Sequence, residues 1–230
     1  MKMPIQVCVF DVNETLLDLA PLEQHFEDWF QSSAVMREWF AQLVLYSQSI
    51  TLSGRYLDFG ELAVAVLEMV ARVHSKLLPS DAGQTLRSTI VSLPAHEDVE
   101  PALERLRGAG MRLVTLTNSG AEAQRRQLDH AGIAGLFEAQ FSVESVRAFK
   151  PARSTYDSVA EAMNVNPHEM IMVACHAWDL IGAQAAGYKT GFVGRSGNSL
   201  LLVHDAQATY EGKGLAELVD QILACGNLPK

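Results

Sequence analysis

The chain has 230 residues, of which 48% are hydrophobic and 20% are charged, and its formal net charge is −9. This composition is typical of a globular protein with a large core, and the length suits one α/β domain or a core domain with an insertion. The negative charge disfavours nucleic acid and anionic membranes as partners, although it does not exclude a small anionic substrate.

The first predicted element is an apolar strand that ends on a carboxylate. Val7 to Phe10 is typical of a strand buried on both faces, and Asp11 follows at its carboxyl end. Open α/β sheets bind their ligands at that end, so Asp11 is a candidate nucleophile. Taken alone, an aspartate there is also a common helix N-cap. Two positions further on stands Asn13, where a phosphate-handling enzyme of this design needs a second acid.

A helical region follows the first strand. Between about residues 21 and 76 the apolar residues recur at helical spacing, and Gly54 and Gly60 are predicted to separate the helices. We predict an all-helical insertion over residues 16–95, with residues 92–95 as the return crossing. The alternative, in which these helices are simply part of the core domain, stays open at this point.

Strands and helices alternate from residue 99 onward. The predicted helices cover residues 100–109, 122–131, 154–163 and 180–186, and the predicted strands cover residues 112–116, 170–174 and 190–193, with a short strand beginning at residue 141. Repeated strand–helix units of this length predict a parallel sheet with right-handed crossovers. The predicted fold class is therefore α/β, with a Rossmann-like parallel sheet.

Polar residues gather where these strands end. The second strand runs into Thr117 and Asn118, a later loop carries Lys150 with Tyr156 beyond it, and the third strand runs into the segment Cys175-His176-Ala177-Trp178-Asp179. Such clustering at the carboxyl ends of parallel strands is typical of an α/β active site.

These segments resemble a known superfamily. Phe10-Asp11 through Thr15-Leu16, Leu116-Thr117-Asn118, Lys150-Pro151 and the final Asp179 are similar, in order, to the four motifs of the haloacid dehalogenase superfamily. Further segments resemble its type II branch, the L-2-haloacid dehalogenases; these are Gly54-Arg55-Tyr56, Phe59, Ala177-Trp178-Asp179 and Gly182-Ala183. The resemblance covers about residues 5–200. It implies a core of residues 1–15 and 96–230, a helical cap of residues 16–95, an active site between them, and a plausible homodimer.

The resemblance also implies catalytic roles. Asp11 is expected to attack the substrate and form a covalent ester, with Thr15 holding its carboxylate. Lys150 is expected to keep Asp11 ionised and to stabilise charge in the transition state, and Asp179 to orient Lys150 or the hydrolytic water. His176 is expected to act as general base for that water or to hydrogen-bond the ester carbonyl.

A second set of residues is expected to contact the substrate. Thr117 and Asn118 are expected to donate hydrogen bonds to a substrate carboxylate or departing anion, although turn chemistry at a strand end would also explain them. The remaining expected contacts are aromatic, namely Phe40, Phe59, Tyr156 and Trp178.

Two departures from the superfamily's phosphatases bear on the reaction. Those enzymes protonate the leaving group with an acid at the position of Asn13, and bind Mg²⁺ through an acid at the position of Cys175. An amide cannot donate an acidic proton, and a thiol is a poor ligand for a hard cation. The sequence therefore predicts displacement at carbon without a metal or cofactor.

A third departure concerns the substrate. The type II enzymes are expected to carry an arginine at position 40 facing the substrate carboxylate and the halide, whereas this chain has Phe40. Arg37 or Gln42 are candidates to replace it, although a bidentate arginine contact is not easily substituted. Where relatives place an asparagine, this chain has His176.

The leading hypothesis is a hydrolytic dehalogenase that converts short 2-haloalkanoic acids to 2-hydroxy acids. Two alternatives stay open: a phosphatase with unusual ligands, and a catalytically weak protein that kept the scaffold for binding or regulation.

The segment Met1-Lys2-Met3-Pro4 leads into the first strand without a signal peptide, and no apolar run has membrane-spanning length. Three distant cysteines, without a Cys-x-x-Cys pair, predict neither a disulfide framework nor a zinc knuckle. We therefore expect a cytoplasmic location.

Overall fold

The computed structural model describes residues 5–203 and 207–225, so the segment Met1-Lys2-Met3-Pro4 lies outside the described residues. Within them, one parallel sheet of six strands has the order β3-β2-β1-β4-β5-β6. The strands are β1 (Val7–Phe10), β2 (Arg112–Thr117), β3 (Ala139–Ser142), β4 (Met170–Ala174), β5 (Lys189–Val193) and β6 (Tyr210–Gly212). The predicted fold class, an α/β Rossmann-like sheet, is confirmed.

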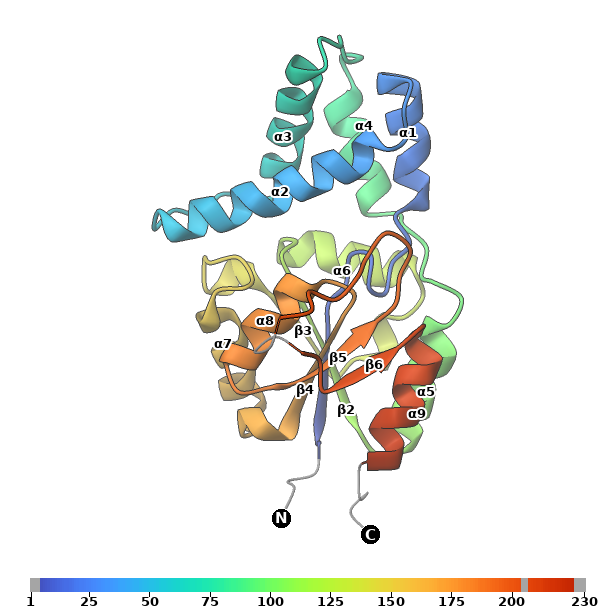
Figure 1. Cartoon of the computed structure of the whole chain (residues 1–230), viewed down its shortest axis with the longest axis vertical. Coiled ribbons are helices and arrows are strands. Elements are labelled where there is room, and N and C mark those ends of the chain that lie inside the picture. Colours follow the sequence, from blue (N-terminus) through green and yellow to red (C-terminus); the bar gives the residue numbers. More distant parts are fainter. Residues whose placement is uncertain (1–4, 204–206, 226–230) are drawn as a thin grey trace.

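Helices cover both faces of the sheet (Figure 1). Helices α5 (Val99–Gly108) and α9 (Leu215–Cys225) lie on one face, and α7 (Arg153–Met163) and α8 (Ala177–Ala185) lie on the other. Helix α6 (Ala121–His130) packs beside β3. Strands β1 and β4 are buried along their whole length because they are covered on both sides, which accounts for their uninterrupted apolar sequences.

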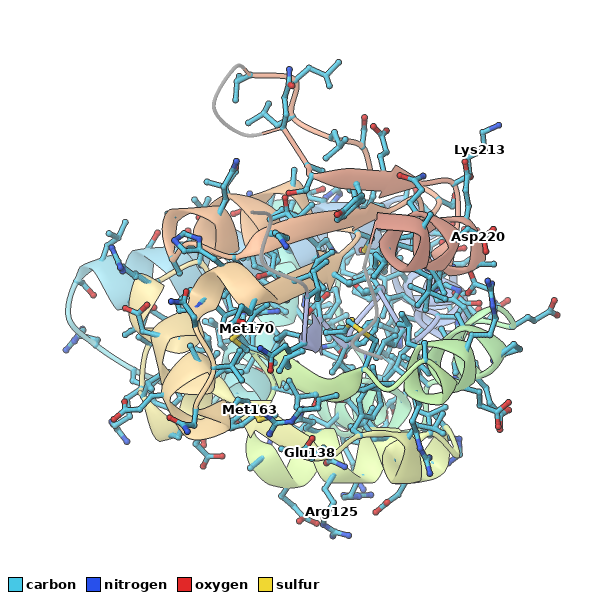
Figure 2. All side chains as sticks on the ribbon, turned by 90° about the horizontal axis from the view of Figure 1, so that it is seen from below. Arg125, Glu138, Met163, Met170, Lys213 and Asp220 are labelled. Carbon is cyan, nitrogen blue, oxygen red and sulfur yellow. The ribbon has the colours of Figure 1, made fainter. Side chains whose placement is uncertain are left out.

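Figure 2 looks at the molecule from below and shows how the side chains divide between core and surface. Met163 and Met170 lie within the body of the protein and are buried. Arg125 and Asp220 lie at the periphery, where Arg125 pairs with Glu122 at 2.7 Å. Charged residues on the surface and apolar residues inside are what the composition predicts.

Four further helices lie over the carboxyl ends of the strands (Figure 1). They are α1 (Ala20–Phe30), α2 (Val35–Leu52), α3 (Phe59–Val73) and α4 (Ala82–Ile90). Gly54 lies between α2 and α3 with a φ of 71°, a backbone conformation that glycine adopts readily. Gly60 does not separate helices as expected, because it lies in the first turn of α3, whose N-cap Asp58 accepts a hydrogen bond from the backbone N–H of Glu61.

The chain enters and leaves these four helices at adjacent points. Leu17 and Ala95 form an antiparallel bridge, and the backbone N–H of His96 donates to the carbonyl of Leu16 at 2.9 Å. The division into a core of residues 1–15 and 96–230 and a cap of residues 16–95 stays a prediction. Among the described helices, none combines the length and apolarity needed to cross a bilayer.

Candidate active site

The candidate site begins at the end of the central strand. β1 pairs with β2 on one side and with β4 on the other, and the backbone N–H of Asp11 continues this pairing by donating to the carbonyl of Val173 at 3.0 Å. The first residues after β2 and β4 therefore lie beside Asp11. This register explains why groups more than a hundred residues apart in the sequence meet at one point.

Lys150 is the cation of the site. Its ammonium group is fully buried and donates three hydrogen bonds, to Asp11 Oδ1 at 2.7 Å, to Asp179 Oδ2 at 2.7 Å and to the carbonyl of Leu116 at 2.9 Å. An ammonium has three donors, so each has a partner. Burial alone would lower the pKa of Lys150, but the two carboxylates outweigh it and raise this pKa. Lys150 is thus a fixed positive charge at ordinary pH.

Asp11 is surrounded by groups that favour its ionised form. Besides Lys150, the hydroxyl of Thr15 donates to Asp11 Oδ2 at 2.7 Å, and His176 Nδ1 lies 3.2 Å from the same oxygen. Burial would raise the pKa of this carboxyl, but Lys150 and His176 hold it well below its usual value. Asp11 is therefore a buried carboxylate held in its ionised form, the form that nucleophilic attack requires.

Asp179 is the second carboxylate that accepts a hydrogen bond from Lys150. The hydroxyl of Tyr156 donates to Asp179 Oδ1 at 2.6 Å, and both side chains are fully buried. Burial raises the pKa of Asp179, with Lys150 opposing this and Asp11 adding to it. Tyr156, expected to contact the substrate, thus donates to Asp179 and positions that carboxylate.

His176 joins Asp11 to a residue with no role assigned from the sequence. Its Nε2 lies 2.9 Å from Glu14 Oε2, while its Nδ1 faces Asp11. Burial would lower the pKa of His176, but Cys175, Asp11 and Glu14 outweigh it and raise this pKa well above the usual value. The imidazole is thus held between two carboxylates, in a fixed orientation.

Glu14 is buried and has a positive φ of 65°, which is uncommon for a residue other than glycine. Its other carboxylate oxygen pairs with Arg37 of α2, and Arg37 also donates to the carbonyl of Ser196 at 2.8 Å. A charged residue between the apolar Val12 and Leu16 was the sequence signal that could have identified Glu14. Arg37 therefore contacts Glu14, and neither Arg37 nor Gln42 lines the cavity of about 800 Å³ beneath helices α1–α4.

The end of β2 contributes Thr117, its last residue, and Asn118, which holds the backbone at Lys150. Asn118 Oδ1 accepts a hydrogen bond from the backbone N–H of Lys150 at 2.9 Å, and Thr117 Oγ1 accepts one from the backbone N–H of Ser119 at 3.2 Å. Both side chains keep a donor, the Asn118 amide and the Thr117 hydroxyl. Asn13 is engaged elsewhere, because it donates to Ser119 Oγ at 3.0 Å and accepts from Gln127 at 2.8 Å.

Aromatic rings border the site. The ring of Phe40 is 5.5 Å from that of His176, and Trp178 stacks on the same imidazole at 5.2 Å between centroids. Phe59 packs against Phe149 at 5.7 Å. A cavity of about 800 Å³ lies between helices α1–α4 on one side and, on the other, α6 with the segments that follow β1 and β2; Phe40, Phe59, Asn13 and Ser119 are among its lining residues. Asp11 is not among them, and Phe40 connects the cavity to the site because its ring also lies against that of His176.

Comparison with known proteins identifies the class. The sequence profile of the haloacid dehalogenase-like hydrolases matches residues 5–187, and the chain belongs to that family. Its relatives specify the branch. The chain is 29% identical to (S)-2-haloacid dehalogenase 1 of Pseudomonas sp. (strain CBS-3) over 194 residues, which are 84% of this chain and 86% of the relative.

Solved structures agree with this branch. The crystal structure of an L-2-haloacid dehalogenase is 25% identical and superposes with a TM-score of 0.91 over 96% of this chain and 100% of the other. A dehalogenase crystallised as an intermediate complex is 26% identical, with a TM-score of 0.88 over 96% of this chain and 98% of the other. The protein is thus a haloacid dehalogenase-like hydrolase whose relatives include (S)-2-haloacid dehalogenases.

Proposed function

We propose that this protein hydrolyses short 2-haloalkanoic acids to 2-hydroxy acids through an ester on Asp11, without a metal. The observation that carries the proposal is the buried carboxylate of Asp11, held by Lys150, Thr15 and His176 at the end of β1. The names of the relatives support the choice of substrate. The side chains at positions 13 and 175 favour attack on carbon over attack on phosphorus, because neither is an acid.

In the first step an oxygen of Asp11 attacks C2 of the substrate. A carbon–oxygen bond forms, the carbon–halogen bond breaks, and the halide leaves with the bonding electron pair. Negative charge moves from the carboxylate to the halide. Because a halide leaves without being protonated, the reaction does not need an acid at the position of Asn13. The donors left on Thr117 and Asn118 are suited to the substrate carboxylate or the departing halide.

In the second step water attacks the carboxyl carbon of the Asp11 ester. Esterification removes the charge of Asp11, one of the groups that raise the pKa of His176, so the imidazole can release its Nδ1 proton to solvent. With Nε2 anchored to Glu14, the free Nδ1 is then suited to accept the water proton. The ester bond then breaks between the carboxyl carbon and the oxygen that attacked C2. The product alkoxide takes the proton from His176, the second water proton leaves for solvent, and the Asp11 carboxylate is regenerated with one oxygen from water.

Residues 16–95 are proposed to act as a cap that excludes water from this reaction. Phe40 of α2 and Phe59 of α3 line the cavity together with Ser119 of the core, which supports a substrate bound between the two parts. Desolvation of this kind strengthens the interactions of Asp11 with its charged partners. A cytoplasmic location and a homodimer stay predictions.

The direct test is release of halide from chloro-, bromo- and fluoroacetate and from both enantiomers of 2-chloropropionate, in buffer containing a chelator. We expect halide from at least one of these acids and no Mg²⁺-dependent phosphate release from a chromogenic ester. Phosphate release that requires Mg²⁺ would instead favour the phosphatase alternative. No turnover of any compound, together with thermal stabilisation by a haloacid, would favour a binding protein.

Replacing Phe40 with arginine should change the substrate profile. Because Phe40 lines the cavity and contacts His176, an arginine there places a positive charge next to the bound acid. We expect KM for 2-chloropropionate to fall by about tenfold, which corresponds to about 1.4 kcal/mol. Phe137→Arg is the matched control, because Phe137 packs against Phe10 from outside the cavity. An unchanged KM for Phe40→Arg would contradict a pocket position for residue 40.

Replacing His176 with glutamine should slow the second step more than the first. Halide should then appear as a burst close to one equivalent per enzyme, followed by turnover slowed by about 10²–10⁴-fold, the usual contribution of a general base. Mass spectrometry of the denatured protein should find the carboxyalkyl group of the substrate esterified to Asp11. Glu14→Gln should reproduce the burst with a smaller loss of turnover, because the imidazole remains but loses its anchor. Equal slowing of burst and turnover would contradict the role of His176 in ester hydrolysis.

A further inference from the structure

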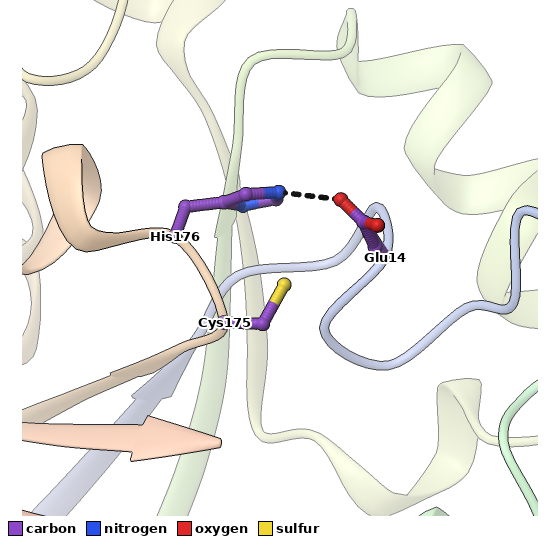
Figure 3. A group of neighbouring side chains, drawn as sticks. All are labelled: Glu14, Cys175 and His176. Carbon is purple, nitrogen blue, oxygen red and sulfur yellow. Dashed lines mark hydrogen bonds and ion pairs between the residues drawn. The ribbon is translucent and has the colours of Figure 1, made fainter. Parts of the chain in front are cut away.

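Glu14, Cys175 and His176 form a group of buried side chains beside Asp11 that can ligate a metal ion (Figure 3). One ligand atom from each lies within 4.8 Å of those of the other two, and all three residues are buried. Figure 3 shows the sulfur of Cys175 pointing toward the paired side chains of His176 and Glu14. Cys175 and His176 follow β4, whereas Glu14 comes from the loop after β1, so the fold brings the group together.

The donor set selects the type of cation. A thiolate, an imidazole and a carboxylate are the ligands that Zn²⁺ accepts, and three protein ligands leave a fourth position open. Mg²⁺ and Ca²⁺ prefer oxygen ligands, and sulfur disfavours both. The thiol that argues against a magnesium phosphatase is thus a ligand suited to a softer ion.

Neighbouring contacts orient these ligands. Arg37 pairs with the Glu14 oxygen that His176 does not contact, and the backbone N–H of Cys175 donates to Thr15 Oγ1 at 3.1 Å. Such partners, which fix ligands from outside, are a regular part of metal sites. Glu14 is also held in a left-handed conformation that turns it into the site.

We propose that Glu14, Cys175 and His176 bind one Zn²⁺-like ion, and that this ion inhibits the enzyme. The ion displaces the proton between His176 and Glu14, and the thiol of Cys175 releases its proton to solvent on binding. An imidazole that binds the ion through Nε2 keeps its single proton on Nδ1, so His176 can no longer accept a proton from the hydrolytic water. The inhibition, although not the binding, rests on the proposed function.

Binding is tested with Co²⁺ as the probe, on the full chain after dialysis against a chelator. We expect one equivalent of Co²⁺ to produce a thiolate-to-cobalt charge-transfer band in the near ultraviolet. Cys175→Ser should lose the band, and Cys8→Ala, which removes a thiol inside β1, should keep it. Glu14→Gln should keep the band but bind Co²⁺ at least about tenfold more weakly. Losing a residue that only orients a metal ligand already weakens binding by about this factor, and Glu14 is proposed as a ligand itself.

Inhibition is tested with Zn²⁺ in the halide-release assay. Zn²⁺ should inhibit the wild-type protein reversibly, and Cys175→Ser, which keeps a polar side chain beside Thr15, should need at least about tenfold more Zn²⁺. A Cys175→Ser protein that binds Co²⁺ as the wild type does, or a wild type without the band, would overturn the proposal. Because the band does not depend on turnover, it separates failure of this site from failure of the dehalogenase assignment.

Discussion

Replacing Asp11 with asparagine is expected to reduce halide release by at least about 10⁴-fold, the scale on which loss of an enzyme nucleophile acts. The amide is nearly the same size but has neither the charge nor the free carboxylate oxygen needed to attack carbon. Steady-state halide release from 2-chloropropionate is the measurement. KM should change much less than kcat, because the substrate is held by other groups.

The fold should survive this substitution. Lys150 keeps Asp179 and the Leu116 carbonyl as acceptors, and Thr15 keeps an amide oxygen to which it can donate. Asp28→Asn, on the exposed side of α1, is the matched control and should retain full activity. Asp11→Asn activity within about a hundredfold of the wild type would be incompatible with a covalent role for Asp11.

Replacing Lys150 with methionine is expected to lower stability as well as activity. It leaves Asp11 and Asp179 buried without their shared cation, and breaking a buried ion pair in this way costs about 3–5 kcal/mol. For a chain of this length that corresponds to a fall in Tm of about 6–20 °C. Thermal unfolding followed by circular dichroism measures the shift. The loss of positive charge should also reduce kcat, because only His176 then remains to lower the pKa of Asp11.

Two comparisons isolate the stranded charge as the cause. Lys213→Met removes an exposed ammonium and should change stability by less than about 0.5 kcal/mol. Adding Asp179→Asn to Lys150→Met should recover part of the lost stability, because one of the two unpaired carboxylates is removed. A Lys150→Met protein as stable as the wild type would mean that Lys150 does not hold the two carboxylates together.

Most of the sheet could be predicted because its strands are short apolar segments between recognisable turns. The predicted strand at residues 170–174 coincides with β4, and the predicted helix at residues 154–163 differs from α7 by one residue. Strand β6 was missed because three residues carry no periodicity. Helix α9 was also missed, although Leu215, Leu218, Val219 and Ile222 have helical spacing and are buried.

The candidate site was predictable to the extent that it follows from topology. Asp11, Thr117 and His176 come from the ends of neighbouring strands, so any parallel sheet with this order brings them together. The contact between Glu14 and His176 was not predictable, because it depends on the left-handed backbone at Glu14. The place of Tyr156 was not predictable either, since a helical pattern does not say which buried group a phenol contacts.

The most direct test of the ester mechanism is a single-turnover reaction in H₂¹⁸O with enzyme in excess over a reactive 2-haloacid. The label should appear in a carboxylate oxygen of Asp11, located by mass spectrometry of its peptide, and the 2-hydroxy acid should be unlabelled. This follows because water attacks the carboxyl carbon of the ester and the product keeps the original Asp11 oxygen. Label in the hydroxy acid and none at Asp11 would contradict the account, because water would then have displaced the halide directly.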